Sequence, residues 1–117
     1  MAQGQTGSRP HRIVRLTPEA EDDRLLAYLY TEQRWGTNQA ENYDAFLQAV
    51  MQELANHPAA APFVENLNGV RSRTARWKSA RHGHRIFFQE IDEGILVLHI
   101  LHTAMNWQER FNLKQEN

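Results

Sequence analysis

The segment HGHRIFFQEIDEGILVLHILHTAMNW, which spans residues 82–107, decides the fold of this chain. It contains two apolar runs of strand length, at 84–90 and 95–101, and the sequence Asp92-Glu93-Gly94 stands between them. Apolar runs separated by a short connection with glycine are typical of a β-hairpin. The second run continues into the polar residues 102–107. The segment therefore predicts two antiparallel strands that lead into a histidine-containing loop.

The residues at the start of the chain predict a strand followed by a helix. A short apolar stretch at 11–16 is read as a first strand. Thr17-Pro18-Glu19 then predicts the helix start, because threonine is a favoured N-cap and proline is favoured at the first helical position. We expect the helix to run to about Trp35. Its expected buried stripe consists of Leu25, Leu26, Tyr28 and Leu29.

A second helix is predicted directly after Gly36, since glycine commonly ends a helix. We expect Thr37 or Asn38 to cap the second helix, which should end near 56–58, because a residue before proline resists the helical conformation. Its apolar residues recur at the spacing of one helical face. They are Ala40, Tyr43, Leu47, Val50 and Leu54, with Phe46 and Met51 beside them.

The order of the predicted elements indicates an α+β fold. A further strand at about 70–77 precedes the hairpin, and a short helix after Thr103 is expected to follow it. The order is β-α-α-β-β-β with a final short helix. It predicts a helical hairpin packed on one face of a small, mostly antiparallel sheet. The other face or its rim is then expected to carry function.

Length and composition limit the class of protein. The chain has 117 residues, 41% of them hydrophobic and 23% charged, which is typical of a globular protein. We expect one domain over 11–117 and a flexible tail over 1–10. The absence of cysteine excludes disulfides, cysteine zinc sites and a cysteine nucleophile. With no signal-like segment and no long apolar run, we expect a soluble, cytoplasmic protein without a membrane partner.

The charge of the chain is unevenly distributed. Up to Asn68 there are five Lys/Arg and nine acids, a balance of −4, and from Gly69 onward there are eight Lys/Arg and five acids, a balance of +3. The acid-free stretch between Asn66 and Gln89 holds Arg71, Arg73, Arg76, Lys78, Arg81 and Arg85. This pattern predicts a cationic surface for an anionic partner. The alternative is a solvated strand face whose basic side chains protect a sheet edge.

The histidines are the main candidates for chemistry. His82 and His84 can point to one side of a strand, but no third ligand follows at a metal-site spacing, so we expect no metal and no cofactor. His99 and His102 should face opposite ways. No nucleophile elbow or phosphate-binding glycine loop is present.

General acid–base cleavage of RNA is a further alternative, since it needs titratable groups and cations. His84, Arg85 and His102 would be its catalytic residues. In the competing interpretation His102 anchors the final turn, and no residue is catalytic. Four aromatic residues alternate with basic ones: Trp77, Phe87, Phe88 and Trp107. Most of them are expected in the core, although base stacking stays an alternative and direct nucleic-acid binding is left open.

Several motifs together resemble the ParE-type toxins of the RelE/ParE superfamily of bacterial toxin–antitoxin systems. The resemblance covers about 13–111 and begins with LTPEAEDD at 16–23. The sharpest matches are HRIFF at 84–88 and ILHTAMN at 100–106. Asn106 stands where the family has aspartate, and Phe88 stands where tyrosine is frequent.

The resemblance implies a toxin that inhibits DNA gyrase rather than cleaving RNA. It also implies neutralisation by a ParD-like antitoxin in a toxin–antitoxin hetero-oligomer. The alternatives are a RelE-like ribosome-dependent mRNA endoribonuclease, against which the lack of a tyrosine after Trp107 counts, and a non-toxic antitoxin-binding protein. The residues expected to bind target or antitoxin are Arg71, Arg73, Arg76, Lys78, Arg81, Arg85, His102, Met105, Asn106 and Trp107.

Overall fold

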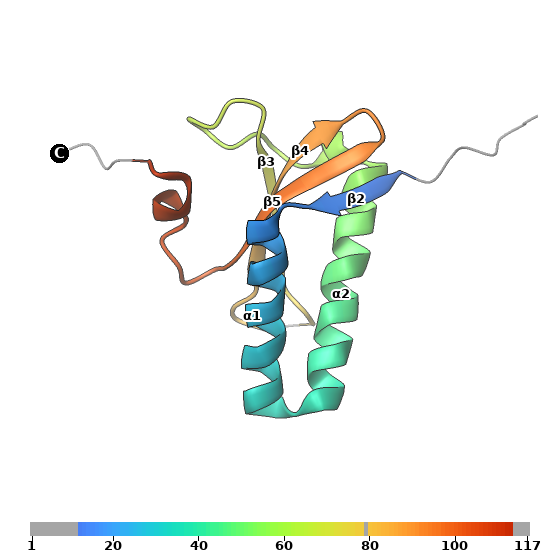
Figure 1. Ribbon diagram of the computed structural model, residues 1–117, viewed down its shortest axis with the longest axis vertical. Helices are drawn as coiled ribbons and strands as arrows, with labels where there is room; N and C mark the ends of the chain where they lie inside the picture. The colour runs from blue at the N-terminus through green and yellow to red at the C-terminus, as the bar shows by residue number, and fades with distance from the viewer. Residues whose placement is uncertain (1–11, 79, 114–117) are drawn as a thin grey trace, which may run out of the picture.

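Two long helices lie side by side against one face of a four-stranded sheet (Figure 1). The computed structural model describes residues 12–78 and 80–113, so the tail predicted over 1–10 lies outside the described residues. In chain order the elements are β2 (Ile13–Leu16), α1 (Pro18–Trp35), α2 (Thr37–Asn56), the 3₁₀ turn η1 (Pro58–Ala60), β3 (Arg71–Ala75), β4 (His84–Ile91), β5 (Gly94–His102) and the 3₁₀ turn η2 (Trp107–Phe111).

The sheet has the strand order β2-β5-β4-β3. β2 runs parallel to β5, whereas β5, β4 and β3 pair in antiparallel fashion. This arrangement confirms the predicted α+β fold with a helical hairpin on a mostly antiparallel sheet. Within the described residues, no helix is both long and apolar enough to cross a membrane.

Helix α1 begins as predicted but buries a different face. The Thr17 hydroxyl accepts a hydrogen bond from the Ala20 N–H at 3.0 Å, and Pro18 is the first helical residue. The predicted stripe is wrong: Leu25, Leu26 and Leu29 are 56%, 61% and 47% exposed. The buried residues of α1 are Ala20, Asp23, Ala27 and Thr31. Because these side chains are short, the helix approaches the sheet and α2 closely, and its large apolar residues face outward.

Helix α2 packs as its periodicity predicts. Ala40, Leu47, Val50, Met51 and Leu54 are buried, and the half-buried Tyr43 and Phe46 pack against the same core. The predicted cap is wrong, because Gly36 alone connects the two helices and occupies both the C-cap of α1 and the N-cap of α2. Its φ of 95° favours glycine. The Thr37 hydroxyl instead donates to the Glu32 carboxylate at 3.0 Å.

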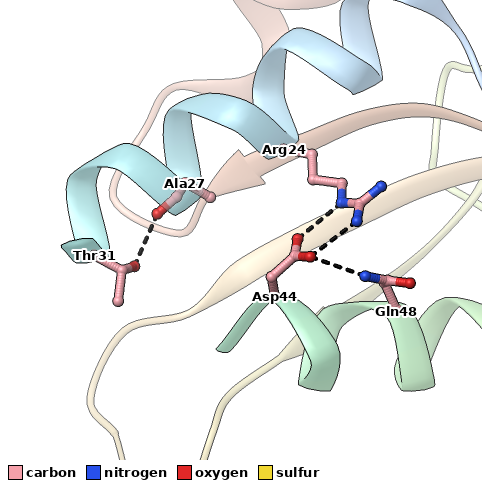
Figure 2. A network of polar contacts seen from close by, with 5 residues as sticks. All are labelled: Arg24, Ala27, Thr31, Asp44 and Gln48. Atoms are coloured by element: carbon pink, nitrogen blue, oxygen red, sulfur yellow. Dashed lines mark hydrogen bonds and ion pairs between the residues drawn. The ribbon is translucent and has the colours of Figure 1, made fainter. Parts of the chain in front are cut away.

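A polar network holds the two helices together (Figure 2). Arg24 donates from Nε and Nη2 to the two carboxylate oxygens of Asp44 at 2.8 and 2.9 Å. Gln48 donates to Asp44 at 2.8 Å from the next turn of α2. The hydrogen bond from Arg24 lowers the pKa of Asp44 and raises the pKa of Arg24. Such a bidentate pair fixes the rotation of α1 relative to α2.

A bulge in the β4–β5 pairing places apolar side chains on both faces of the sheet. Phe87 pairs with His99 and Phe88 pairs with Val97, so Leu98 is an additional residue in β5. A bulge of this kind reverses the alternation of side chains beyond it. Val97 and Ile100 therefore both belong to the core under the helices, whereas Leu98 and Leu101 belong to a second cluster.

The second cluster covers the face of the sheet that the helices leave free. Phe87 and Leu101 pack there against Val64 and Val70 of the loop before β3, and against side chains of η2. The ring centroid of Trp107 lies 5.3 Å from that of Phe87. The short helix predicted after Thr103 is present as η2. The part of the second sheet face around Phe87 and Leu101 is therefore covered by the second cluster.

The carboxylate of Asp23 accepts a backbone hydrogen bond at the edge of β5, beyond the residues that pair with β2. β2 pairs only with residues 94–97 of β5. Beyond this pairing, the Thr17 hydroxyl donates to the Leu98 carbonyl at 3.0 Å. Asp23, which is 8% exposed, accepts from the Ile100 N–H at 2.9 Å and from His99 Nδ1 at 2.8 Å.

Replacing Asp23 with alanine is expected to destabilise the fold by about 2 kcal/mol, since the buried Ile100 N–H then has no acceptor. Asp23→Asn, which keeps an acceptor oxygen, should cost about half as much. Urea unfolding followed by circular dichroism measures both. The control is Asp22→Ala at the exposed neighbour. Equal stabilities for Asp23→Ala and Asp22→Ala would show that this contact does not hold β5.

Candidate functional site

A concave surface lies between α1 and the ends of β4 and β5. It consists of two neighbouring pockets of about 340 and 290 Å³, which share Tyr30, His84 and His102. We call it the histidine groove. Its principal lining residues are Leu26, Tyr30, Trp77, His82, His84, His102 and Met105.

Strand pairing and one tight backbone contact bring three histidines together in this groove. His84 and His102 are cross-strand partners, and their ring centroids are 5.4 Å apart. Gly83 exchanges two hydrogen bonds with Thr103, which holds His82 at 5.4 Å from His102. A Cβ on Gly83 would lie 2.0 Å from the Ala75 carbonyl oxygen, so only glycine permits this approach.

Burial keeps His84 neutral at physiological pH. Desolvation, together with the charge of His102, lowers the pKa of His84 to about 4. Burial likewise raises the pKa of Tyr43 to about 12. The Tyr43 hydroxyl therefore stays protonated, and it shares a hydrogen bond of 2.7 Å with His84 Nδ1.

His102 anchors the turn that follows β5, as one of its two interpretations predicted. Its Nδ1 accepts a hydrogen bond from the Ala104 N–H at 3.1 Å. Its ring lies edge-on to Tyr30 of α1, with 6.4 Å between the centroids. Burial and the nearby His82 lower the pKa of His102. His99 contacts Phe111 in the second cluster, so His99 and His102 do face opposite ways as predicted.

The structure does not gather the six basic residues into one surface. Arg71 and Arg73 are on the helix side of β3, where Arg71 donates to the Ala61 carbonyl and Arg73 pairs with Glu53 at 3.0 Å. Arg76, Lys78 and Arg81 are exposed in the loop between β3 and β4. Of the six, only Lys78 lines the histidine groove.

Arg85 lies on the sheet face opposite to His84 and His102, because neighbouring side chains of a strand alternate. Its Nε donates to the Ser72 hydroxyl at 3.0 Å, and its guanidinium lies 4.8 and 5.0 Å from the ring centroids of Phe87 and Trp107. The three residues that a ribonuclease mechanism would use therefore do not form one constellation.

The three predicted binding residues Met105, Asn106 and Trp107 also lie in different places. Met105, which is 38% exposed, lines the groove beside Leu26 and Tyr30. Asn106 is exposed in front of η2, and Trp107 packs on the second face. Within 12–78 and 80–113, no group of three or more His, Cys, Asp or Glu side chains is arranged to hold a metal ion.

Sequence reasoning missed the contribution of α1 to the groove. Tyr30 and Leu26 form its wall, and Tyr43 and Trp77 line its inner part. A signal was available, since 25–30 contains more large apolar residues than one buried stripe can hold. The approach of His102 to His82 and His84 in the folded chain had no counterpart in sequence spacing.

Comparisons with known proteins agree on one family. The family model described as "ParE toxin of type II toxin-antitoxin system, parDE" matches residues 14–107. "Toxin ParE1" of Caulobacter vibrioides is 31% identical over 98 residues, which cover 84% of this chain and 93% of that protein.

A solved structure agrees with the fold. The structure titled "Chromosomal ParDE TA system from P. aeruginosa" matches with a TM-score of 0.62 and 20% identity, and the match covers 78% of this chain and 96% of that one. The family match spans most of the described residues, and the sequence relative is matched over nearly its whole length. This chain therefore belongs to the ParE toxin family of type II toxin–antitoxin systems.

Proposed function

We propose that this toxin inhibits DNA gyrase by binding it, and that a ParD-like antitoxin neutralises the toxin by occupying the histidine groove. One observation carries the proposal: the wall of the groove is made of large apolar side chains that the fold leaves exposed. Leu26 is 61% exposed, and Tyr30 and Met105 stand beside it. Apolar residues gathered at a concave surface mark a site for a protein segment.

The form of the groove suits an amphipathic helix or an extended segment that folds on binding. Leu26 and Tyr30 are one helical turn apart on α1, and Met105 faces them from the segment after β5. Partner side chains spaced by three or four residues can occupy such a groove in succession. Lys78 and Arg110 at its rim favour a segment with acidic residues.

The electrostatics of the groove support binding rather than RNA cleavage. A general acid at physiological pH needs a pKa near neutrality, whereas the pKa of His84 is about 4. The cation proposed for charge stabilisation, Arg85, is packed on the other face of the sheet. The ribonuclease and non-toxic alternatives stay predictions without a structural observation in their favour.

Inhibition of gyrase is tested by DNA supercoiling with purified enzyme. We expect the free toxin to abolish supercoiling and to accumulate cleaved DNA, and we expect an excess of ParD-like antitoxin to restore supercoiling. Translation of a reporter messenger RNA in a reconstituted system is the matched control and should be unaffected. Unchanged supercoiling at a large molar excess of toxin, together with arrested translation, would contradict gyrase inhibition and support the ribonuclease alternative.

Occupation of the groove is tested with Leu26→Glu and with Leu25→Glu as the control. Both leucines are exposed on α1, but Leu25 lines a separate depression with Arg24 and Asp44. Losing one buried leucine contact, at about 2 kcal/mol, weakens binding about thirtyfold. We expect a loss of this order for Leu26→Glu and less than about threefold for Leu25→Glu in calorimetric titration. Equal affinities of the two variants would place the antitoxin elsewhere.

A further inference from the structure

We propose that His82, His84 and His102 form a carboxylate-binding subsite, in which an acidic side chain of the bound peptide contacts the imidazoles and His102 takes up a proton. The inference rests on the proposed function, since the peptide is taken to belong to the antitoxin. It adds the chemistry that the subsite recognises and a dependence of the complex on pH.

The histidine groove presents a hydrogen-bond donor on His102. His102 Nδ1 accepts a hydrogen bond from the Ala104 N–H, and His84 Nδ1 is hydrogen-bonded to the Tyr43 hydroxyl. The proton of the neutral His102 ring is therefore on its Nε2 atom. Within the described part of the chain, neither Nε2 atom has a hydrogen-bond partner. Both residues line both pockets of the groove, so an acceptor is the ligand group that complements the Nε2–H of His102.

The ionisable groups around the three rings favour an anionic ligand. The ionisable groups that surround them come from α1, α2, the β3–β4 loop, β4 and η2. They are Asp23, Tyr30, Tyr43, Lys78, His82, His84 and Arg110. Among these the one carboxylate is Asp23, whose Oδ2 already accepts from the Ile100 N–H and from His99. The remaining groups are cationic or neutral, which favours an incoming carboxylate over an incoming cation.

A bound carboxylate changes the protonation of His102. In the free chain, burial and the charge of His82 lower the pKa of His102. A carboxylate against the ring stabilises the imidazolium and raises that pKa in the complex. Binding then takes up a proton at pH values between the free and the bound pKa of His102. Affinity is highest at low pH and falls as the pH rises through the bound pKa.

Besides a carboxylate, the ligand needs a large apolar residue that packs against the apolar wall of the groove. Leu26, Tyr30 and Met105 lie in the same pocket as His84 and His102. A carboxylate that reaches the imidazoles brings its neighbouring residues against this wall. The subsite is therefore selective for an acidic residue that lies within one helical turn of a large apolar residue.

The test is calorimetric titration of the full chain with ParD-like antitoxin at pH 6.0 and 8.0, in buffers of different ionisation enthalpy. We expect affinity at pH 6.0 to exceed that at pH 8.0 by about tenfold, with net proton uptake. His102→Gln should bind with similar affinity at both pH values and without uptake. His57→Gln, at the exposed end of α2, is the control and should behave like the unchanged chain.

A second probe separates the subsite from the antitoxin proposal. It is a synthetic amphipathic peptide of leucine and glutamate, compared with its leucine–glutamine counterpart. Tighter binding of the glutamate peptide with proton uptake, lost in His102→Gln, supports the subsite even if no ParD-like antitoxin binds. Antitoxin binding that is equal at both pH values, with or without His102, overturns the subsite and leaves the proposed function standing. Equal binding of the two peptides also overturns it.

Discussion

The additional residue in the β4–β5 pairing is the constraint on which the rest of this structure depends. Leu98 shifts the alternation of side chains, so that Val97 and Ile100 both face the helices while Leu101 faces the opposite side. The same shift sets His102 on the helix side, opposite His84. With a regular pairing, His102 would point to the second face, and the three-histidine arrangement would not exist.

The way α1 packs determines which surface is left for a partner. Small side chains face the sheet, so the backbone of α1 lies close to β5 and Asp23 reaches the Ile100 N–H. Large apolar side chains consequently point outward and form the wall of the groove. The antitoxin segment proposed above would bury these side chains, and their burial would offset the conformational entropy that the segment loses on ordering.

The polar groups of the groove fit recognition better than bond cleavage. Neutral His84, which is hydrogen-bonded to Tyr43, has little capacity to exchange protons near neutral pH. His102 is more exposed than His84 and lies beside His82, so its protonation depends on what occupies the groove. The basic residues serve separate purposes, since Arg71 and Arg85 support packing and Arg73 pairs with α2.

Sequence by itself determined the order of elements, the Thr17 cap, the buried stripe of α2 and the β4–β5 hairpin, because these follow from interactions between residues close in the chain. Only the tertiary structure decided which face of α1 is buried, since both a small-residue stripe and a large apolar stripe were available. It also decided the bulge at Leu98 and the dispersal of the basic residues over two faces. Register between strands and the approach of a helix depend on packing across the whole core, which local spacing does not encode.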